Sequence, residues 1–216
     1  AEQFVESKLG GLDMLEAGHG ILNAGLMFAR TCMRAGLHVF ANAEYPSLIR
    51  GGHNHLDVRV SEKKIYAHTK HLCLLVALNM DAVTKHKNKI VEGGGIIYDG
   101  NELALDAKDF PGIKLYPLPL LEVANANGGR IVRNTVAMGA TMALVDLDLD
   151  IFNGVIRDNF GKKKGEKVAN DNIAATKAGY DYIKQNFPDD FKFKLEKVDN
   201  TERIFISGNE AISAGA

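Results

Sequence analysis

LCLLVAL, residues 72–78, is among the longest uninterrupted apolar stretches in the sequence, and it decides the fold class. Its length is typical of a strand, and the absence of polar alternation predicts a central strand covered on both faces. The next residues, 79–87, have the pattern of a short helix. A buried strand followed directly by a helix indicates a fold in which strands and helices alternate around a sheet.

The sequence before this strand predicts one helix and several strands. Residues 20–35 carry apolar side chains at helical spacing and end at Gly36, which suits a left-handed helix terminus. Strands are predicted at 37–41 and 55–61, with a long loop between them. A Glu-Lys-Lys turn then leads into residues 64–68, which we expect to return as the second strand of a hairpin. LGGLDML, residues 9–15, lies before the predicted helix and has a poor strand pattern, so the sequence does not decide where the sheet begins.

The sequence after this strand continues the alternation and then becomes mostly helical. Strands are predicted at 95–100 and 113–119, and helices at 134–145, 151–160 and 166–187. The expected fold class is α/β: three layers, a mainly parallel sheet with helices on both faces, and one strand hairpin.

The composition excludes several classes of function. The chain has 216 residues, 46% of them hydrophobic and 25% charged, with a net charge of −1. This balance favours neither nucleic acid nor an anionic membrane as partner. The apolar runs are far shorter than the roughly 20 residues of a membrane span, and the first residues do not form a signal peptide. We therefore expect a cytoplasmic protein.

The two cysteines, Cys32 and Cys73, lie in apolar segments without a neighbouring cysteine at metal or redox spacing. We expect both to be core thiols. A cubane iron–sulfur cluster normally needs four thiolates, so this chain alone is not expected to hold one.

A glycine-rich turn precedes the first predicted helix. Gly18 and Gly20 lie in the stretch AGHGI, and Gly25 follows in the helix. Backbone amides at the positive end of a helix can hold phosphate or carboxylate. Asn23 occupies the position of the third glycine of the dinucleotide fingerprint, so the match to that motif is weak. The alternative is that these glycines only permit a tight turn and close helix packing.

The loop between the strands at 37–41 and 55–61 is a more specific candidate site. Its sequence is EYPSLIRGGHN, residues 44–54. Arg50 supplies a planar charged fork suited to phosphate or carboxylate, and Gly51 and Gly52 allow the backbone to approach a ligand closely. The alternative is a structural loop in which Arg50 pairs with Glu44.

Four histidines, His53, His55, His68 and His71, fall within one region of the sequence. No carboxylate or cysteine accompanies them at a recognised spacing for a metal site. His53 and His55 are predicted to share a strand face, whereas His68 and His71 are expected on a solvated turn. The sequence therefore predicts no metal site.

Four motifs together resemble the γ domain of the 2-oxoacid:ferredoxin oxidoreductases. They are GHGILNAG, ANAEYPSLIRGGHNHLDVRVS, GGRIVRNTVAMGA and FGKKKGEKVANDNIAATKAGYDY, beginning at residues 18, 41, 128 and 160. The resemblance is closest to proteins in which this domain precedes a fused α subunit, because ISGNEAI at 206–212 resembles the start of that subunit's pyrimidine-binding domain. The expected domains are therefore a γ-type domain at 1–187, a linker at 188–202 and a truncated α-domain start at 203–216. The chain is expected to be a fragment.

The resemblance implies a component of an oligomeric enzyme that is inactive alone. Such enzymes decarboxylate a 2-oxoacid on thiamine diphosphate, pass electrons through an iron–sulfur cluster to ferredoxin, and release an acyl-coenzyme A. The implied partners are a β subunit carrying thiamine diphosphate and the cluster, the rest of the α subunit, and ferredoxin. The implied work of this domain is assembly and a share of the coenzyme A site, with no catalytic residue. The expected ligand contacts are Gly18, Gly20, Arg50, Gly51, Gly52 and Asn54.

The family's usual turn, Gly-Glu-Ala-Gly-Gln-Gly, is altered here, because Leu15 replaces the first glycine and His19 the glutamine. Asn134, Asn172 and Gly179 match the helical half of the family pattern, and we expect them to act as caps and packing contacts. Two other classes stay open from the residues alone. They are a free-standing nucleotide-binding module built on the glycine turn and a purely structural interaction domain.

Overall fold

The computed structural model describes residues 12–15, 19–44, 54–161, 164–199 and 203–216. Its described strands form one six-stranded sheet in the order β2-β3-β1-β4-β5-β6. The strands span β1 (Leu12–Leu15), β2 (His38–Glu44), β3 (His55–Ser61), β4 (Leu72–Ala77), β5 (Ile90–Asp99) and β6 (Lys114–Leu118). Strand β1 pairs in parallel with β4, β4 with β5 and β5 with β6, whereas β3 is antiparallel to both β1 and β2.

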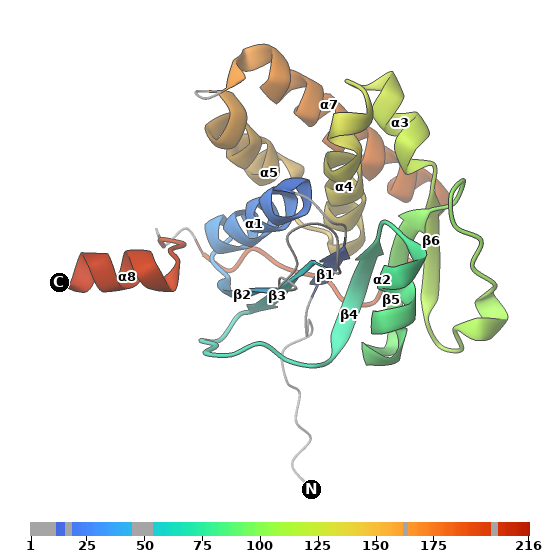
Figure 1. Cartoon of the computed structure of the whole chain (residues 1–216), viewed down its shortest axis with the longest axis horizontal. Helices are drawn as coiled ribbons and strands as arrows, with labels where there is room; N and C mark the ends of the chain where they lie inside the picture. Colours follow the sequence, from blue (N-terminus) through green and yellow to red (C-terminus); the bar gives the residue numbers. More distant parts are fainter. Residues whose placement is uncertain (1–11, 16–18, 45–53, 162–163, 200–202) are drawn as a thin grey trace, which may run out of the picture.

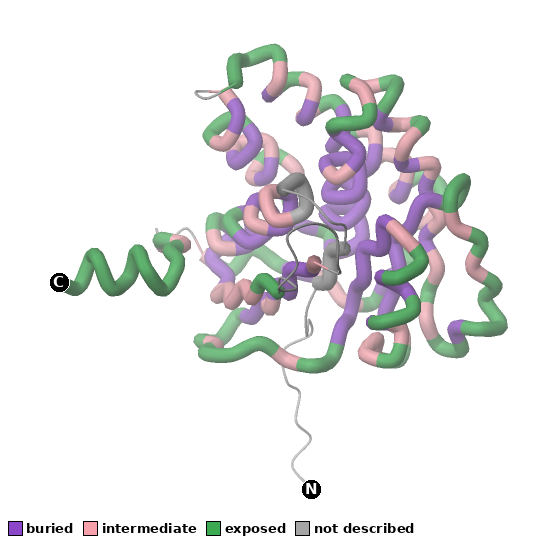
Figure 2. The backbone as a smooth tube through the Cα atoms, viewed as in Figure 1, coloured by how far each residue is buried: buried purple, intermediate pink, exposed green. Residues whose placement is uncertain are grey.

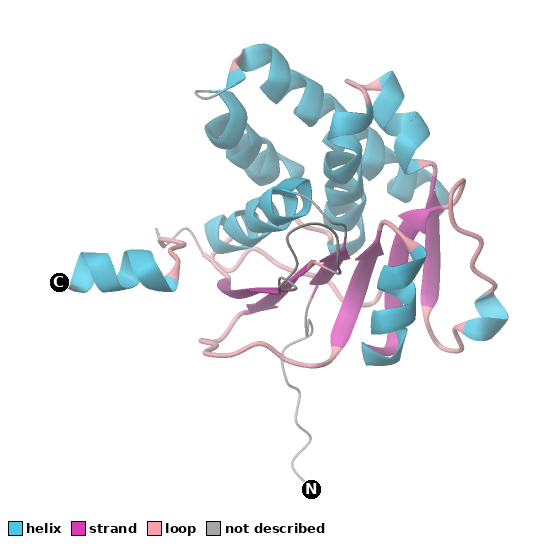
Figure 3. Cartoon of the chain, in the orientation of Figure 1, coloured by secondary structure: helices cyan, strands magenta, loops and turns pink. Residues whose placement is uncertain are grey.

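Helices cover both faces of this sheet, as the sequence predicts (Figure 1). The principal helices are α1 (His19–Arg34), α2 (Met80–His86), α3 (Leu120–Ala126), α4 (Arg133–Val145), α5 (Leu149–Ile156), α7 (Glu166–Asn186) and α8 (Gly208–Gly215). The short helical turns are η1 (Lys87–Lys89), η2 (Ala107–Asp109), η3 (Arg130–Val132) and the π-helical η4 (Arg157–Gly161). Helices α1, α4, α5 and α7 lie on one face, and α2 lies on the other beside β4 and β5 (Figure 3).

Strand β4 is buried on both faces because its alternate side chains enter two separate cores. Leu74 and Val76 point into the large core beneath α1 and α4, whereas Leu75 and Ala77 join a smaller cluster beneath α2. The buried backbone runs through the centre of the molecule in Figure 2. The unbroken apolar run therefore has the physical cause inferred from the sequence.

The structure settles the start of the sheet, which the sequence left open, and contradicts one expectation about a hairpin. Residues 12–15 form β1, a strand between β3 and β4, although their short and partly polar sequence is weakly strand-forming. Pairing with a neighbour on each side stabilises a segment whose own propensity is low. Residues 64–68 form no strand, and the antiparallel pair is instead β2 with β3, closed across the long loop.

Helices α4 and α7 cross at very short separation. A Cβ added at Gly179 would overlap the carbonyl oxygen of Val136, and one added at Gly139 would overlap that of Thr176. At the far ends of the same helices, the Lys184 ammonium lies 2.8 Å from the Asp146 carboxylate. The hydrogen bond from Lys184 lowers the pKa of Asp146. The expected packing role of Gly179 is confirmed.

Residues 188–199 have no regular secondary structure but pack on the domain. Phe191 and Leu195 are buried, and Leu195 N donates to the Val145 carbonyl at 2.7 Å. The expected boundary at 188–202 stays a prediction. Helix α8 projects away from the body and is exposed along its length (Figures 1 and 2). In the described part of the chain, no helix combines the length and apolarity of a membrane span.

Candidate functional site

The C-terminal edge of β1 brings two motifs from the sequence together. Leu15, the last residue of β1, pairs with His55, the first residue of β3. Asn54 directly precedes His55, and α1 begins at His19. Gly20 and Asn54 therefore lie at the same edge of the sheet, where α/β folds commonly bind ligands. Of the other expected contacts, Gly18, Arg50, Gly51 and Gly52 lie outside the described residues.

A cavity of about 610 Å³ opens on the helical face beside the first turns of α1. Asn23 lies three residues after Gly20 and lines this cavity, so the cavity lies near the start of α1. The volume falls within the range of about 300–1,000 Å³ that is usual for small-molecule sites. The sequence pattern did not reveal the cavity, because its walls come from three stretches of the chain, residues 23–27, 128–135 and 159–172. The lining residues are Asn23, Ala24, Met27, Gly128, Ile131, Val132, Asn134, Thr135, Asn159, Phe160, Lys164, Val168, Asp171 and Asn172.

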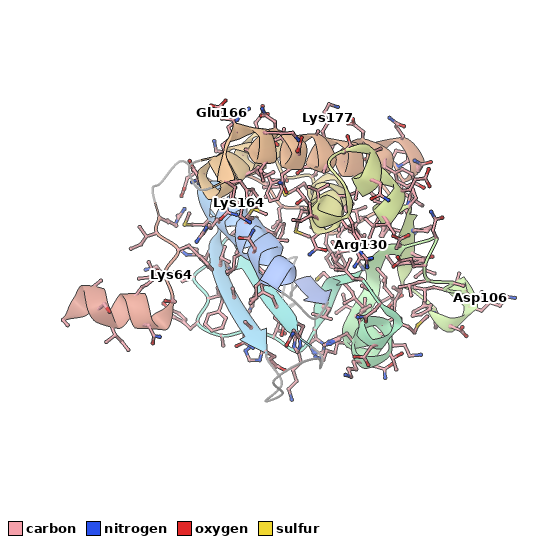
Figure 4. All side chains as sticks on the ribbon, turned by 45° about the horizontal axis from the view of Figure 1, so that its top comes forward. Lys64, Asp106, Arg130, Lys164, Glu166 and Lys177 are labelled. Carbon is pink, nitrogen blue, oxygen red and sulfur yellow. The ribbon has the colours of Figure 1, made fainter. Side chains whose placement is uncertain are left out.

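The cavity is polar at several points and has a cation at its rim. The Asn159 amide donates to Asn23 Oδ1 at 3.0 Å and so joins η4 to α1. The ammonium of Lys164 lies 5.6 Å from the centre of the Phe160 ring. Figure 4 shows Lys164 and the exposed Arg130 on different elements of the face that carries α1. Helices α1, α4 and α7 all contribute residues near their N-terminal ends, where helix dipoles favour anions.

Asn134 and Asn172, both expected to be packing or capping residues, have different roles. Asn172 is buried, accepts a hydrogen bond from Thr135 Oγ1 at 2.7 Å and donates to the Val168 carbonyl at 2.8 Å. It therefore joins α7 to α4 in the cavity wall, as its packing role predicts. Asn134 is only partly buried and lines the cavity.

Thr135→Val is expected to lower the free energy of unfolding by about 1–3 kcal/mol. Valine keeps the shape of threonine but removes the hydroxyl donor, leaving Asn172 Oδ1 buried without this bond. Urea denaturation measures the change. Thr84→Val is the matched control, because Thr84 is exposed on α2 and should change stability by no more than about 0.5 kcal/mol. Equal effects of the two substitutions would contradict the role given to the Thr135–Asn172 bond.

The described histidines differ from one another in environment. His68 and His71 are exposed, as expected for a solvated turn, and His53 lies outside the described residues. His55 is buried, and its Nε2 lies 3.4 Å from Glu44 Oε2 and 3.7 Å from Asp57 Oδ2. Sequence spacing alone did not predict carboxylates beside His55. Glu44 thus has His55 as a partner, and the expected alternative pairing with Arg50 involves a residue outside the described ones.

The chain matches a known family over most of its length. The family is pyruvate ferredoxin/flavodoxin oxidoreductase, matched over residues 16–182. The VorA subunit of ketoisovalerate oxidoreductase from Methanothermobacter thermautotrophicus is 28% identical over 172 residues, which cover 78% of this chain and 35% of that subunit. The KorC subunit of 2-oxoglutarate synthase from Methanocaldococcus jannaschii is 26% identical, with 78% of this chain and 90% of that subunit covered.

A solved structure shows the same fold over almost the whole chain. The 2-oxoglutarate:ferredoxin oxidoreductase from Magnetococcus marinus, with 2-oxoglutarate, coenzyme A and succinyl-CoA bound, superposes with a TM-score of 0.85 at 29% identity. The match covers 95% of this chain and 36% of that one. The present chain thus spans about a third of the length of VorA and of the Magnetococcus chain, and nearly the full length of KorC.

Proposed function

The chain belongs to the pyruvate ferredoxin/flavodoxin oxidoreductase family, and on that premise we propose that it is one component of a 2-oxoacid:ferredoxin oxidoreductase. The complete enzyme oxidatively decarboxylates a 2-oxoacid to an acyl-coenzyme A, and this domain contributes to assembly and to the coenzyme A site. The observation that carries the proposal is the superposition of 95% of this chain on an enzyme whose structure contains 2-oxoglutarate and coenzyme A.

The electron carriers belong to other parts of the complex. Cys32 and Cys73 are both buried, and burial raises the pKa of the Cys32 thiol, which disfavours the thiolate that a cluster needs. Two buried thiols do not fit a four-thiolate iron–sulfur cluster. We assign the cluster and thiamine diphosphate to a β subunit, which passes electrons to ferredoxin. Thiamine diphosphate supplies the electron sink for decarboxylation when it is bound.

The proposed coenzyme A contacts of this chain are Gly18, Gly20, Arg50, Gly51, Gly52 and Asn54. Gly20 lies in the first turn of α1, where free amide groups and the helix dipole attract a phosphate. Arg50 would hold a second phosphate oxygen through its planar fork. The pairing of β3 with β1 places Asn54 at the same edge of the sheet. The adjacent cavity gives the remainder of the ligand a place against Asn23 and Asn134.

Assembly is supported by exposed apolar side chains near the end of the chain. Ile204 and Ile212 are 80% and 74% exposed, although isoleucine is usually buried. Helix α8 begins with a capping box between Ser207 and Glu210, so it has a defined start despite its exposure. We propose that residues 203–216 open the α domain and that the rest of the α subunit covers them.

Coenzyme A binding to the complete complex tests the role of this domain. Isothermal titration should saturate at one coenzyme A per copy of this chain. Asn134→Ala should weaken binding by about tenfold, the equivalent of one lost hydrogen bond. Asn170→Ala is the control, because Asn170 is exposed on α7 and does not line the cavity. Unchanged binding by the Asn134 variant, or the same loss in both, would remove the cavity from the proposed site.

A further inference from the structure

Three side chains of types that can bind a metal converge where β2 ends and β3 begins. Glu44 is the last residue of β2 and pairs directly with His55, the first residue of β3. Asp57 lies two residues further along β3, so its side chain is on the same face as that of His55. The pleat and register of the sheet therefore direct the three side chains to one point.

The distances between the donor atoms suit a shared cation. His55 Nε2 lies 3.4 Å from Glu44 Oε2 and 3.7 Å from Asp57 Oδ2, and all three ligand atoms lie within 4.8 Å of one another. Zinc bonds of about 2.0–2.2 Å at tetrahedral angles place neighbouring ligand atoms roughly 3.3–3.6 Å apart. Direct N–H···O hydrogen bonds are shorter, about 2.7–3.2 Å. The cluster is thus more open than a hydrogen-bonded group and close to the size of a coordination shell.

Asp57 provides an independent indication of a ligand. The residue is only 8% exposed, and among the described residues its Oδ1 has no hydrogen-bond partner. Burying a charged carboxylate is costly unless an opposite charge or hydrogen bonds compensate it. A divalent cation between Asp57, Glu44 and His55 would supply that charge. The Glu44 side chain is 60% exposed, so it can rotate to close the shell.

The surroundings orient the His55 ring and direct the Arg59 charge away from the cluster. The ring of His86, at the end of α2, meets the His55 ring edge-on with centroids 4.9 Å apart. Arg59, two residues beyond Asp57, directs its guanidinium to the Ala67 carbonyl at 3.0 Å. That hydrogen bond turns its charge towards the segment after β3. The imidazole of His55 is therefore held in place by packing on α2.

We propose that Glu44, His55 and Asp57 form a binding site for a divalent transition-metal cation of the zinc type. One imidazole nitrogen and two carboxylate oxygens are ligands that Zn²⁺ accepts, and three protein ligands leave a fourth position for water. The cation joins the end of β2 to the start of β3 and so fixes both ends of segment 45–54.

Zinc titration of the 216-residue chain tests the site without any other substrate. After dialysis against a chelator, calorimetric titration with ZnCl₂ should show one Zn²⁺ per chain, and zinc should raise the melting temperature. Glu44→Gln and Asp57→Asn should each weaken zinc binding by at least about tenfold. His71→Gln should bind as the wild type does, because His71 is exposed and distant from the cluster in sequence.

Each alternative outcome overturns the proposal. Absence of zinc binding to the wild-type chain would leave a plain histidine–carboxylate cluster. Unchanged zinc affinity in the Glu44→Gln chain would have the same meaning. Because the Glu44 side chain is exposed, this variant should fold even if the Asp57→Asn variant does not. Loss of binding in the His71 variant would indicate adventitious surface coordination. Because neither coenzyme A nor a 2-oxoacid is present, a negative result leaves the proposed function intact.

Discussion

Gly179→Ala is expected to lower the free energy of unfolding by about 3 kcal/mol, the upper part of the range for overpacked cores. The added methyl group would overlap the Val136 carbonyl oxygen, which belongs to the backbone of α4. A backbone atom held in a helix cannot move aside as a flexible side chain can, so α4 and α7 must separate. Separation opens the buried interface that includes Thr176 and Ala140. Chemical denaturation followed by circular dichroism measures the loss.

Gly154→Ala is the matched control for this prediction. Gly154 is also in a helix, but an added Cβ would meet only Arg34 Nη1 at 3.6 Å, an ordinary contact. Alanine should therefore stabilise α5 by up to about 1 kcal/mol through helix propensity. Gly139→Ala should behave as Gly179→Ala does, because its methyl group would overlap the Thr176 carbonyl. A neutral Gly179→Ala variant would mean that the two helices are farther apart than described.

Arg50→Ala in the complete complex is expected to raise the KM for coenzyme A by about tenfold to a hundredfold, corresponding to a charge-assisted hydrogen bond of about 1.5–3 kcal/mol. Decarboxylation on thiamine should stay largely intact, because the proposed role of Arg50 is to neutralise a phosphate of coenzyme A. Half-reaction kinetics separate the two steps. The KM for the 2-oxoacid should change little.

Arg30→Ala removes the same charge from an exposed position on α1 and serves as the control. It should leave the KM for coenzyme A unchanged. If Arg50→Ala also leaves that KM unchanged, the assignment of Arg50 fails. An equal effect of both variants would point instead to long-range electrostatics, which salt would screen.

Periodicity and apolar runs predicted most of the fold because they record local burial. The α1 helix, its end before Gly36, and strand β3 were found at nearly their observed bounds. Strand β1 was left open because four residues with Asp13 among them contain too little local signal, and its two neighbours stabilise it through tertiary pairing. The hairpin after β3 was wrong because a turn signal alone does not show which strands will pair.

The candidate site was less predictable because its parts meet only in the folded chain. The sequence indicated the Gly20 and Asn54 regions separately, and the pairing of β1 with β3 places them at one edge. The cavity requires Asn23 and Asn134 to approach one another from segments over a hundred residues apart. The cluster of Glu44 with His55 was missed for a related reason. Ten residues separate the two in sequence, and only the register of β2 with β3 makes them neighbours.

The most direct test of the central claim is turnover by the full-length gene product expressed with its neighbouring-gene partner. The assay follows reduction of a low-potential dye across a panel of 2-oxoacids, with and without coenzyme A. We expect dye reduction with at least one 2-oxoacid that depends on coenzyme A and yields the corresponding acyl-coenzyme A. A folded, cofactor-loaded complex that reduces no dye with any 2-oxoacid would contradict the account and favour a nucleotide-binding module at Gly18–Gly25.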